Sequence, residues 1–323
     1  MTEITENTKK ILEVILNLKE GQVMSYRDVG ALAGLPNGAR QVSRILHSMS
    51  KKYELPWWRV VRSDRTIGLP EPAKSEQMEL LKKEGISFTA QGKIIIEDES
   101  LNYEPINKEL EILYEDQDII AIDKDANLTV NSKGQESLAN YISYYFLKNN
   151  IKSQVRFINR LDMNTSGIIL IAKNPYAQAY YQKLIENNDF DKEYLALVEG
   201  NLEIDKTIFL KINYDENNKK MKIADEGDEI KTYFKNIKLY DKFSLIYCKI
   251  YTGKTHQIRI SLSNLNHPII GDKLYGSKYK LDRFLLHSYK ASFIRFRDGE
   301  KITILSRPNF DKYLNSSLLR GDS

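Results

Sequence analysis

The residues whose types and spacing suggest chemistry lie in segment 159–173, which reads NRLDMNTSGIILIAK. It places a guanidinium at Arg160 and a carboxylate at Asp162, followed by a polar turn with a glycine that can adopt positive φ. Residues 168–171 are apolar and mostly β-branched, which is typical of a buried strand. We therefore expect Asp162 on a loop at the end of a central strand, a common position for catalytic groups. An Arg–Asp surface pair ahead of a strand would give the same pattern.

Three later segments offer partners for this carboxylate. Residues 192–198 read KEYLALV, residues 252–259 read TGKTHQIR, and residues 267–276 read HPIIGDKLYG. In this order the four motifs resemble those of the RluA-type RNA pseudouridine synthases, and the resemblance extends over roughly residues 112–307. It implies an isomerisation of uridine to pseudouridine in RNA that uses no cofactor.

The resemblance also assigns roles to individual residues. Asp162 would be the essential carboxylate, as a nucleophile or as a base, and Arg259 its basic partner, which would keep it ionised and oriented. Tyr194 would pack against the target base, and Arg160 would fill the space that a flipped base leaves. The other residues expected to bind substrate are Thr255, His256 and Gln257.

Each of these residues also has a structural interpretation. Tyr194 lies in an apolar segment and could be a core residue, and Arg259 could be a surface cation on a helix. His256 and Gln257 could position their loop without touching substrate. The intact set of carboxylate, tyrosine and basic partner favours the catalytic interpretation.

Four positions differ from the usual pattern of the family. Asn159 and Ser261 stand where histidine is usual, Asn266 where glycine is usual, and Lys254 where arginine is frequent. None of these differences removes the carboxylate, the tyrosine or the basic partner. They leave the fit of the substrate open, and the sequence indicates neither which RNA nor which uridine is modified.

The C-terminal two thirds predict an α+β domain. We expect strands at residues 119–122, 168–171, 194–198, 207–212, 232–237 and 243–251, and helices at 136–147, 176–185 and 255–265. Because strands and helices are mixed without regular βαβ alternation, we expect a mixed, largely antiparallel sheet. The single cysteine, Cys248, falls in one of these strands and should be buried.

The N-terminal third predicts a small helix-turn-helix domain, which is winged-helix-like in outline. Apolar spacing indicates helices at residues 8–18 and 39–49, and Ser25 can cap a helix that begins at Tyr26. The turn signal LPNG separates the second helix from the third. A short helix at 75–84 and a short strand at 93–96 follow.

Charge in this third indicates contact with nucleic acid. Between Gly21 and Arg65 eight basic residues face three acidic ones, a local excess of +5. Such a cluster is typical of a surface that binds phosphate, although a solvated helix face has the same composition. The arginines expected to contact phosphate are Arg27, Arg40, Arg44 and Arg59.

The motif LPWWRVV at residues 55–61 makes the interpretation of the N-terminal third more specific. With GQVMSY at 21–26 and ARQV at 39–42, it resembles the DNA-binding domain of O6-alkylguanine-DNA alkyltransferases, and more closely the alkyltransferase-like proteins, over about residues 9–96. Trp57 stands at the position of the reactive cysteine and Trp58 at that of the histidine that follows. Because a suicide alkyl acceptor needs a thiolate, we expect no alkyl transfer.

The same resemblance implies how this domain binds its ligand. Arg40 matches the arginine that fills the gap left by a flipped nucleotide, and Tyr26 matches a tyrosine that helps to rotate the phosphate. Trp57 would line the pocket for a base, and Arg59 would contribute to phosphate binding. DNA, an alkylated base or RNA are all open as ligands of this domain.

Composition sets the limits of the interpretation. A length of 323 residues suggests two domains, which we expect at 1–103 and 104–323, joined by an acidic, polar linker. A net charge of +4 is compatible with nucleic acid without identifying it. Four histidines and one cysteine without paired spacing argue against a metal site, and we expect no cofactor. We find no signal peptide and no membrane span, and expect a cytoplasmic protein.

The sequence therefore predicts an RNA pseudouridine synthase with an N-terminal nucleic-acid-binding domain that lacks alkyl-transfer activity. One rival is a catalytically silent protein that binds nucleic acid or an alkylated base and only keeps the synthase fold. Asp162, Tyr194 and Arg259 argue against it. The other rival, a fused DNA repair alkyltransferase, is disfavoured by Trp57.

Overall fold

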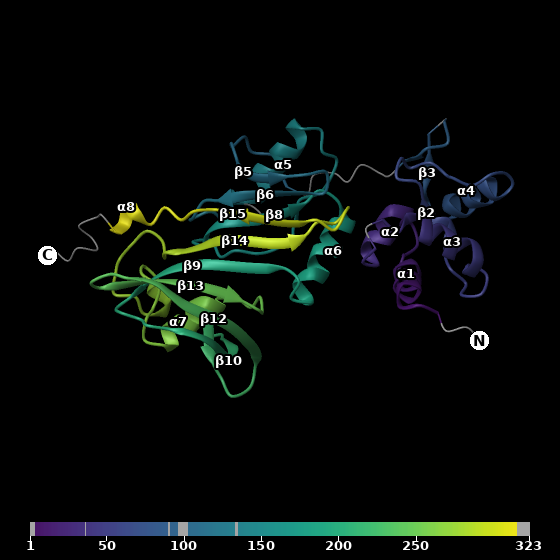
Figure 1. Ribbon diagram of the computed structural model, residues 1–323. Helices are drawn as coiled ribbons and strands as arrows, with labels where there is room; N and C mark the ends of the chain where they lie inside the picture. Colours follow the sequence, from purple (N-terminus) through teal and green to yellow (C-terminus); the bar gives the residue numbers. More distant parts are fainter. Residues whose placement is uncertain (1–3, 36, 90, 96–102, 133–134, 315–323) are drawn as a thin grey trace. The chain divides into compact units, whose positions relative to one another are not determined.

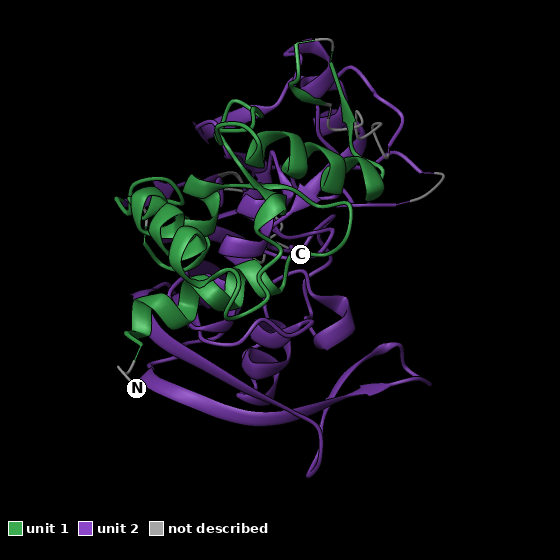
Figure 2. Ribbon diagram, turned by 90° about the vertical axis from the view of Figure 1, so that its right-hand side faces the viewer, with its two compact units in different colours: residues 1–99, 295–300 green, residues 100–294, 301–323 purple. Residues whose placement is uncertain are grey.

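The computed structural model describes residues 4–35, 37–89, 91–95, 103–132 and 135–314 of the chain. The chain divides into two compact units, shown in different colours in Figure 2. Unit 1 comprises Met1–Glu99 with Arg295–Glu300, and unit 2 comprises Ser100–Ile294 with Lys301–Ser323. The expected linker falls largely on residues 96–102, outside the described part, so the domain limits 1–103 and 104–323 stay a prediction.

Unit 1 is a small, mainly helical body (Figure 1). Its elements are α1 (Glu6–Leu16), β1 (Met24–Ser25), α2 (Tyr26–Leu32), α3 (Ala39–Met49), the 3-10 turn η1 (Trp57–Arg59), β2 (Val60–Val61), α4 (Ala73–Lys83), β3 (Ser87–Phe88) and β4 (Ile94–Ile95). The predicted cap of α2 is confirmed, since the Ser25 hydroxyl accepts a hydrogen bond from the Asp28 backbone N–H. Val42, Ile45 and Leu46 form the buried side of α3, as the apolar spacing predicted.

Unit 2 is built on one large sheet. Its strands are β5 (Glu111–Glu115), β6 (Ile119–Lys124), β7 (Arg156–Phe157), β8 (Ser166–Ala172), β9 (Asp191–Glu199), β10 (Asp205–Asp215), β11 (Lys220–Ile223), β12 (Asp228–Leu239), β13 (Phe243–Ile250), β14 (Leu286–Ile294) and β15 (Lys301–Leu305). The order across the sheet is β11-β10-β12-β13-β9-β14-β8-β6-β5, with β15 on β14 and β7 on β8 (Figure 1).

The predicted fold class is confirmed. In this sheet β14 pairs in parallel with β8, whereas the other described ladders are antiparallel. The central strand β8 has all seven residues buried, in agreement with its apolar sequence. At its start, Gly167 has φ 103°, and a Cβ there would lie 2.3 Å from the Ser288 carbonyl oxygen, so only glycine fits this position.

Helices cover the sheet of unit 2 and complete its core. They are α5 (Leu138–Lys148), α6 (Pro175–Glu186), α7 (Gln257–Asn264) and α8 (Asp311–Leu314), with a 3-10 turn η2 (Lys273–Tyr275). In one cluster, Phe146 of α5 packs with Ile122 and Ile171 of the sheet, and Leu262 of α7 belongs to the same cluster. Cys248 is fully buried there, and burial raises the pKa of its thiol. No helix in the described part of the chain is long and apolar enough to cross a membrane.

A buried polar network ties three strands of unit 2, β6, β8 and β14, to Ser306, which follows β15. Since a carbonyl only accepts, the His287 Nε2, 3.1 Å from the Ser306 carbonyl oxygen, carries the ring proton. Nδ1 then accepts from the Ser166 hydroxyl at 2.8 Å, and the Ser306 hydroxyl donates to Asp123. Burial lowers the pKa of His287 to about 4, so the ring is neutral at pH 7.

This network predicts a pH dependence of stability. An unfolded histidine has a pKa near 6.5, so the unfolded chain takes up a proton at His287 before the folded chain does. The stabilisation is present above pH 6.5 and is lost as the pH falls toward 4, by up to ~3 kcal/mol. Urea unfolding at several pH values should show a steeper loss for the wild type than for His287→Gln, which has no titrating ring. Parallel curves for the two proteins would contradict a neutral buried His287.

Candidate active site

A buried lysine is hydrogen-bonded to the loop that carries Asp162. Lys124, at the end of β6, is 1% exposed and donates three hydrogen bonds from Nζ, to the carbonyl oxygens of Asp125, Leu128 and Met163, at 2.7, 2.9 and 2.9 Å. Burial lowers its pKa to about 7, while the three carbonyls satisfy the ammonium. Because Met163 follows Asp162 directly, Lys124 fixes the backbone at the carboxylate.

A second set of bonds fixes the same loop from its start. The Asn159 side chain accepts from the Leu170 N–H at 2.8 Å and donates to the Ile168 carbonyl at 3.3 Å. The Thr165 N–H donates to the Asp162 carbonyl at 3.0 Å, which closes the turn. Asn159, which stands where the family usually has histidine, therefore anchors the loop to β8.

Arg259 lies between two carboxylates. Its Nη1 donates to Asp162 Oδ2 at 3.1 Å, while Nε and Nη2 donate to the two oxygens of Asp272 at 2.7 and 2.9 Å. The side chains of Arg259 and Asp272 are 7% and 1% exposed, whereas Asp162 is 29% exposed. Burial opposes the charge of Arg259, but its bonds to both carboxylates prevail and raise its pKa. The guanidinium is thus locked by Asp272 and presented to Asp162.

The segment before α7 forms a further part of the pocket wall. His256 adopts a left-handed conformation with φ 56°, its Nδ1 lies 3.0 Å from the Tyr275 hydroxyl, and its Nε2 lies 3.9 Å from Asp162 Oδ2. Burial is the main cause that lowers the pKa of His256. Gln257 is 3% exposed, and its amide bonds to Thr252, Lys254, Lys231 and Thr232. Gln257 therefore braces the loop, while Thr255 is exposed at the rim.

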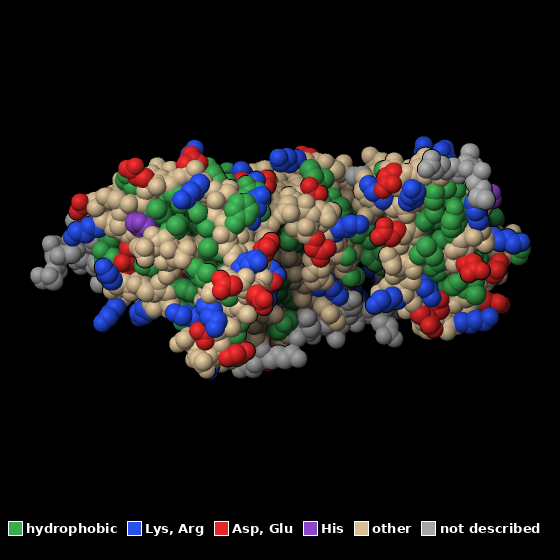
Figure 3. All heavy atoms as spheres, turned by 90° about the horizontal axis from the view of Figure 1, so that it is seen from below, with side chains coloured by type: hydrophobic (Ala, Val, Ile, Leu, Met, Phe, Trp, Pro, Cys, Tyr) green, Lys and Arg blue, Asp and Glu red, His purple; other side chains and the backbone are tan. Residues whose placement is uncertain are grey.

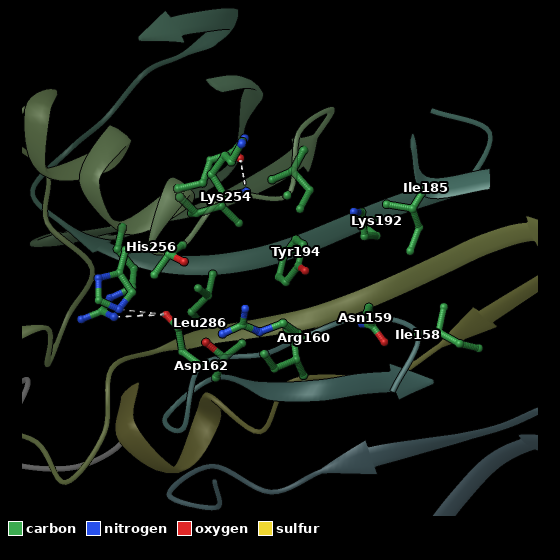
Figure 4. A pocket seen from close by; sticks show the side chains of 18 residues that line it. Ile158, Asn159, Arg160, Asp162, Ile185, Lys192, Tyr194, Lys254, His256 and Leu286 are labelled. Atoms are coloured by element: carbon green, nitrogen blue, oxygen red, sulfur yellow. Dashed lines mark hydrogen bonds and ion pairs between the residues drawn. The ribbon is translucent and has the colours of Figure 1, made fainter. Parts of the chain in front are cut away.

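Tyr194 lies on β9 and is 6% exposed, within the main core cluster. Burial raises the pKa of its hydroxyl, to which Ser288 is hydrogen-bonded. The side chain also forms part of the wall of a pocket of ≈ 270 Å³ (Figure 4). Tyr194 is therefore both a core residue and a pocket residue, so the two interpretations of its sequence position are compatible.

The structure brings all the predicted catalytic and substrate-binding residues of unit 2 to this one pocket. The lining includes Arg160, Asp162, Tyr194, Thr255, His256, Gln257 and Arg259. The sequence alone did not indicate that Lys124 and Asp272 support the site or that Lys192 lines the pocket, although Lys192 and Asp272 lie inside segments 192–198 and 267–276. Among the described residues, no group of three or more His, Cys, Asp or Glu side chains could hold a metal ion.

In unit 1 the structure gives Arg59 partners within the protein. Arg59 was expected to contact phosphate, but its Nε and Nη2 donate to Glu84 at 3.0 and 2.8 Å, and its Nη1 donates to the Leu18 carbonyl at 2.6 Å. Trp58 also donates to Glu84, at 2.7 Å. Because these internal partners occupy the guanidinium, Arg59 holds the tryptophan turn in place instead of reaching outward.

The other predicted residues of unit 1 are accessible. Arg40, in the first turn of α3, is exposed, and Tyr26 and Trp57 are half-buried. The Trp57 ring meets Trp58 edge-on, with 6.2 Å between centroids. Figure 3 shows basic and acidic side chains interspersed over one face of the molecule, and the net charge of the whole chain is only +4.

Both parts of the chain match known protein families. Residues 118–264 match the family model described as RNA pseudouridylate synthase, and residues 6–86 match the DNA-binding domain of 6-O-methylguanine DNA methyltransferase. An uncharacterized RNA pseudouridine synthase of Bacillus subtilis, YhcT, is 36% identical over 61% of this chain and 68% of its own length. The ribosomal large subunit pseudouridine synthase C of Buchnera aphidicola is 31% identical over 64% of this chain and 70% of its own length.

A solved structure supports the same assignment. Human RNA pseudouridylate synthase domain containing 1 matches with a TM-score of 0.55 and 25% identity, and the match covers 64% of this chain and 87% of that one. The chain belongs to the RNA pseudouridine synthases, a class of isomerases. Within them it is of the RluA type that its motifs predicted, and it has an N-terminal alkyltransferase-like DNA-binding domain.

The bond between Arg259 and Asp272 predicts the effect of changing Asp272. Asp272→Asn keeps the shape but leaves the guanidinium without its buried counter-charge, so Arg259 is no longer held against Asp162. We expect single-turnover pseudouridine formation to slow by about 10- to 100-fold, the cost of a small misplacement of a catalytic group.

A melting curve must show that the variant is folded at the assay temperature. RNA affinity should change little, because Asp272 does not line the pocket. A folded Asp272→Asn protein with wild-type turnover would contradict the positioning role.

Proposed function

We propose that the chain isomerises uridine to pseudouridine in structured RNA, most specifically in large-subunit ribosomal RNA, in the cytoplasm. The observation that carries the proposal is the Asp162–Arg259–Asp272 array at the wall of a pocket that also contains Tyr194. The ribosomal assignment rests on the name of the Buchnera aphidicola relative, and transfer RNA is the alternative substrate.

The proposed mechanism assigns one task to each group. The reaction breaks the bond between uracil N1 and ribose C1′ and joins C1′ to uracil C5. C5 then gives up its proton, which exchanges with water, and N1 takes up a proton. Asp162 acts as the nucleophile or the base, and Arg259 keeps it ionised and aimed. Tyr194 stacks on or packs against the uracil, and the exposed Arg160 occupies the space left in the RNA. His256 and Thr255 contact the substrate beside Asp162, where Gln257 holds their loop.

Unit 1 is proposed to bind nucleic acid without accepting an alkyl group. Alkyl transfer to protein needs an accessible thiolate, and Trp57 stands at the position of that thiol. The only cysteine in the chain, Cys248, is fully buried in unit 2 with a raised thiol pKa. Tyr26, Arg40 and Trp57 are accessible and are proposed to contact DNA, an alkylated base or RNA.

The alternative function is a catalytically silent protein that binds nucleic acid or an alkylated base. It predicts binding without turnover. The intact array around Asp162 favours turnover, because a binding protein has no need for a buried carboxylate that aims an arginine at a second carboxylate.

The catalytic proposal predicts the behaviour of Asp162→Asn. The change is nearly isosteric but removes the negative charge, so tritium release from C5-labelled uridine in RNA should vanish while RNA binding persists. In cells that lack the gene, a copy of the wild type should restore the missing pseudouridines, mapped over ribosomal and transfer RNA. The Asp162→Asn copy should restore none.

Asp241→Asn provides a matched control, since this exposed carboxylate lies outside the pocket. Turnover by the Asp162→Asn protein would disprove the assignment of Asp162. Missing pseudouridines confined to transfer RNA would replace the ribosomal substrate by the alternative.

The proposal for unit 1 is tested with the full chain and duplex DNA that carries one O6-methylguanine. Arg40→Ala should weaken binding and lower its salt dependence, and Trp57→Ala should weaken binding by about tenfold, in line with the ~1–3 kcal/mol of a stacked base. Lys74→Ala on α4 removes one exposed charge outside the predicted surface and should have little effect. No methyl group should appear on the protein by mass spectrometry.

Equal binding by Arg40→Ala and the wild type would show that α3 does not contact the ligand. Unmodified duplex DNA and a hairpin RNA serve as competitors, and the competitor that displaces the labelled DNA most effectively identifies the preferred ligand.

A further inference from the structure

Lys192 is a cation in the pocket wall that has no role in the proposed mechanism. It lies on β9, two residues before Tyr194, so both side chains are on the same face of the sheet, roughly 7 Å apart along the strand. It lines the same pocket as Asp162 and Arg259. In Figure 4, Lys192 lies on the Ile185 side of Tyr194, and His256 lies on the other side.

The side-chain ammonium of Lys192 has no hydrogen-bond or ion-pair partner among the residues that the structure describes, in contrast to the lysines around it. Lys249 pairs with Asp191 at 2.5 Å, and Lys290 pairs with Glu193 at 3.1 Å. The neighbours of Lys192 in register on the adjacent strands are Ile250 and Ala291, which offer no charge.

The ammonium of Lys192 lies beside the loop before α7. A Cβ added to Gly253 would meet the Lys192 Nζ at 3.5 Å, so the ammonium lies next to this glycine. Gly253 and Lys192 both line the pocket, so an anionic group that enters there can reach the ammonium.

The charges of the pocket leave Lys192 without a counter-ion. Asp162 is the one carboxylate in the lining, and Arg259 already pairs with it. Lys254, also in the lining, pairs with Asp228 at 2.8 Å. Burial lowers the pKa of Lys192, which reflects the cost of keeping an unpaired ammonium partly out of water. A ligand that brings an anionic oxygen to this position would remove that cost.

We propose that Lys192 binds a backbone phosphate of the RNA next to the target uridine. This deepens the proposed function, since it names a subsite of the same pocket. Uracil is neutral before the reaction, whereas a uridine that is turned into a pocket brings its own charged phosphates with it. A lysine is a point charge with rotatable donors and suits a phosphate whose orientation is set by other contacts.

The test measures binding of a synthetic hairpin RNA with uridines in its loop to the full chain at several salt concentrations. Lys192→Met should weaken binding by about tenfold or more at low salt, the cost of one charge-assisted contact. The slope of log affinity against log salt should fall by about 0.7–0.9, the contribution of one neutralised phosphate. Lys192→Arg should keep the slope.

Lys249→Met is the matched control. It removes the same charge from the neighbouring strand β13, at a side chain that bonds Asp191 and does not line the pocket, so its salt slope should match the wild type. This control separates a contact at Lys192 from a loss of general positive charge.

A second set of RNAs locates the phosphate. Each carries one uncharged methylphosphonate near the loop uridines. At one position this replacement should weaken binding to the wild type by about as much as Lys192→Met does, and should have no further effect on the variant. In turnover assays the variant should show a raised KM and a retained kcat, because the contact is the same before and during the reaction.

An unchanged salt slope for Lys192→Met, or a loss of kcat with unchanged affinity, would overturn the proposal and point to a contact with the base. The binding readout does not depend on turnover. A lower salt slope for Lys192→Met in a protein that forms no pseudouridine would support the phosphate contact and refute the proposed function. Turnover by the wild type with an unchanged slope for Lys192→Met would support the proposed function and refute the phosphate contact.

Discussion

The site depends on one guanidinium that is shared by two carboxylates of different environment. Asp272 is buried and takes two donors of Arg259, while Asp162 is partly exposed and takes one. A buried arginine is stable between these carboxylates because its N–H donors are hydrogen-bonded to carboxylate oxygens on both sides, which compensates for the loss of hydration. The Phe284 and Tyr275 rings lie 4.3 and 5.0 Å from the guanidinium carbon and limit its movement further. The partly exposed Asp162 is the member of the array that a substrate can reach.

The position of Asp162 itself depends on contacts between distant parts of the chain. Lys124 at the end of β6 holds the carbonyl of Met163, and Asn159 joins the loop to β8. The local sequence alone indicates a loop before a buried strand, which is correct because seven consecutive buried residues leave a clear apolar pattern. It does not indicate Lys124, since a lysine after an apolar strand usually points to solvent. The bond that makes it a support spans 39 residues of sequence.

Elements with a clear local apolar pattern were predicted, whereas features that depend on contacts between distant residues were not. Helices α3 and α5 and strands β6, β8, β9 and β13 follow from periodicity and were predicted. Strands β14 and β15 were missed, because β14 mixes Ser288, Lys290 and Ser292 with its apolar residues and is stabilised by pairing on both sides. The internal bonds of Arg59 were not foreseen for the same reason. A basic residue in a basic segment indicates an outward phosphate contact, but Glu84, 25 residues later, binds it internally.

The combination of an alkyltransferase-like domain with a synthase has a physical use only if both parts bind polymers that occur together. A weak second site on one chain raises the local concentration of a shared ligand at the first site. If unit 1 binds RNA, this effect acts directly on the substrate. If it binds DNA, it brings no uridine to Asp162, because DNA carries thymine, and tethering would help only where new RNA is still close to its template. If Arg40 and Trp57 bind nucleic acid as proposed, the preferred polymer decides whether unit 1 increases affinity for the substrate or determines where in the cell the substrate is met.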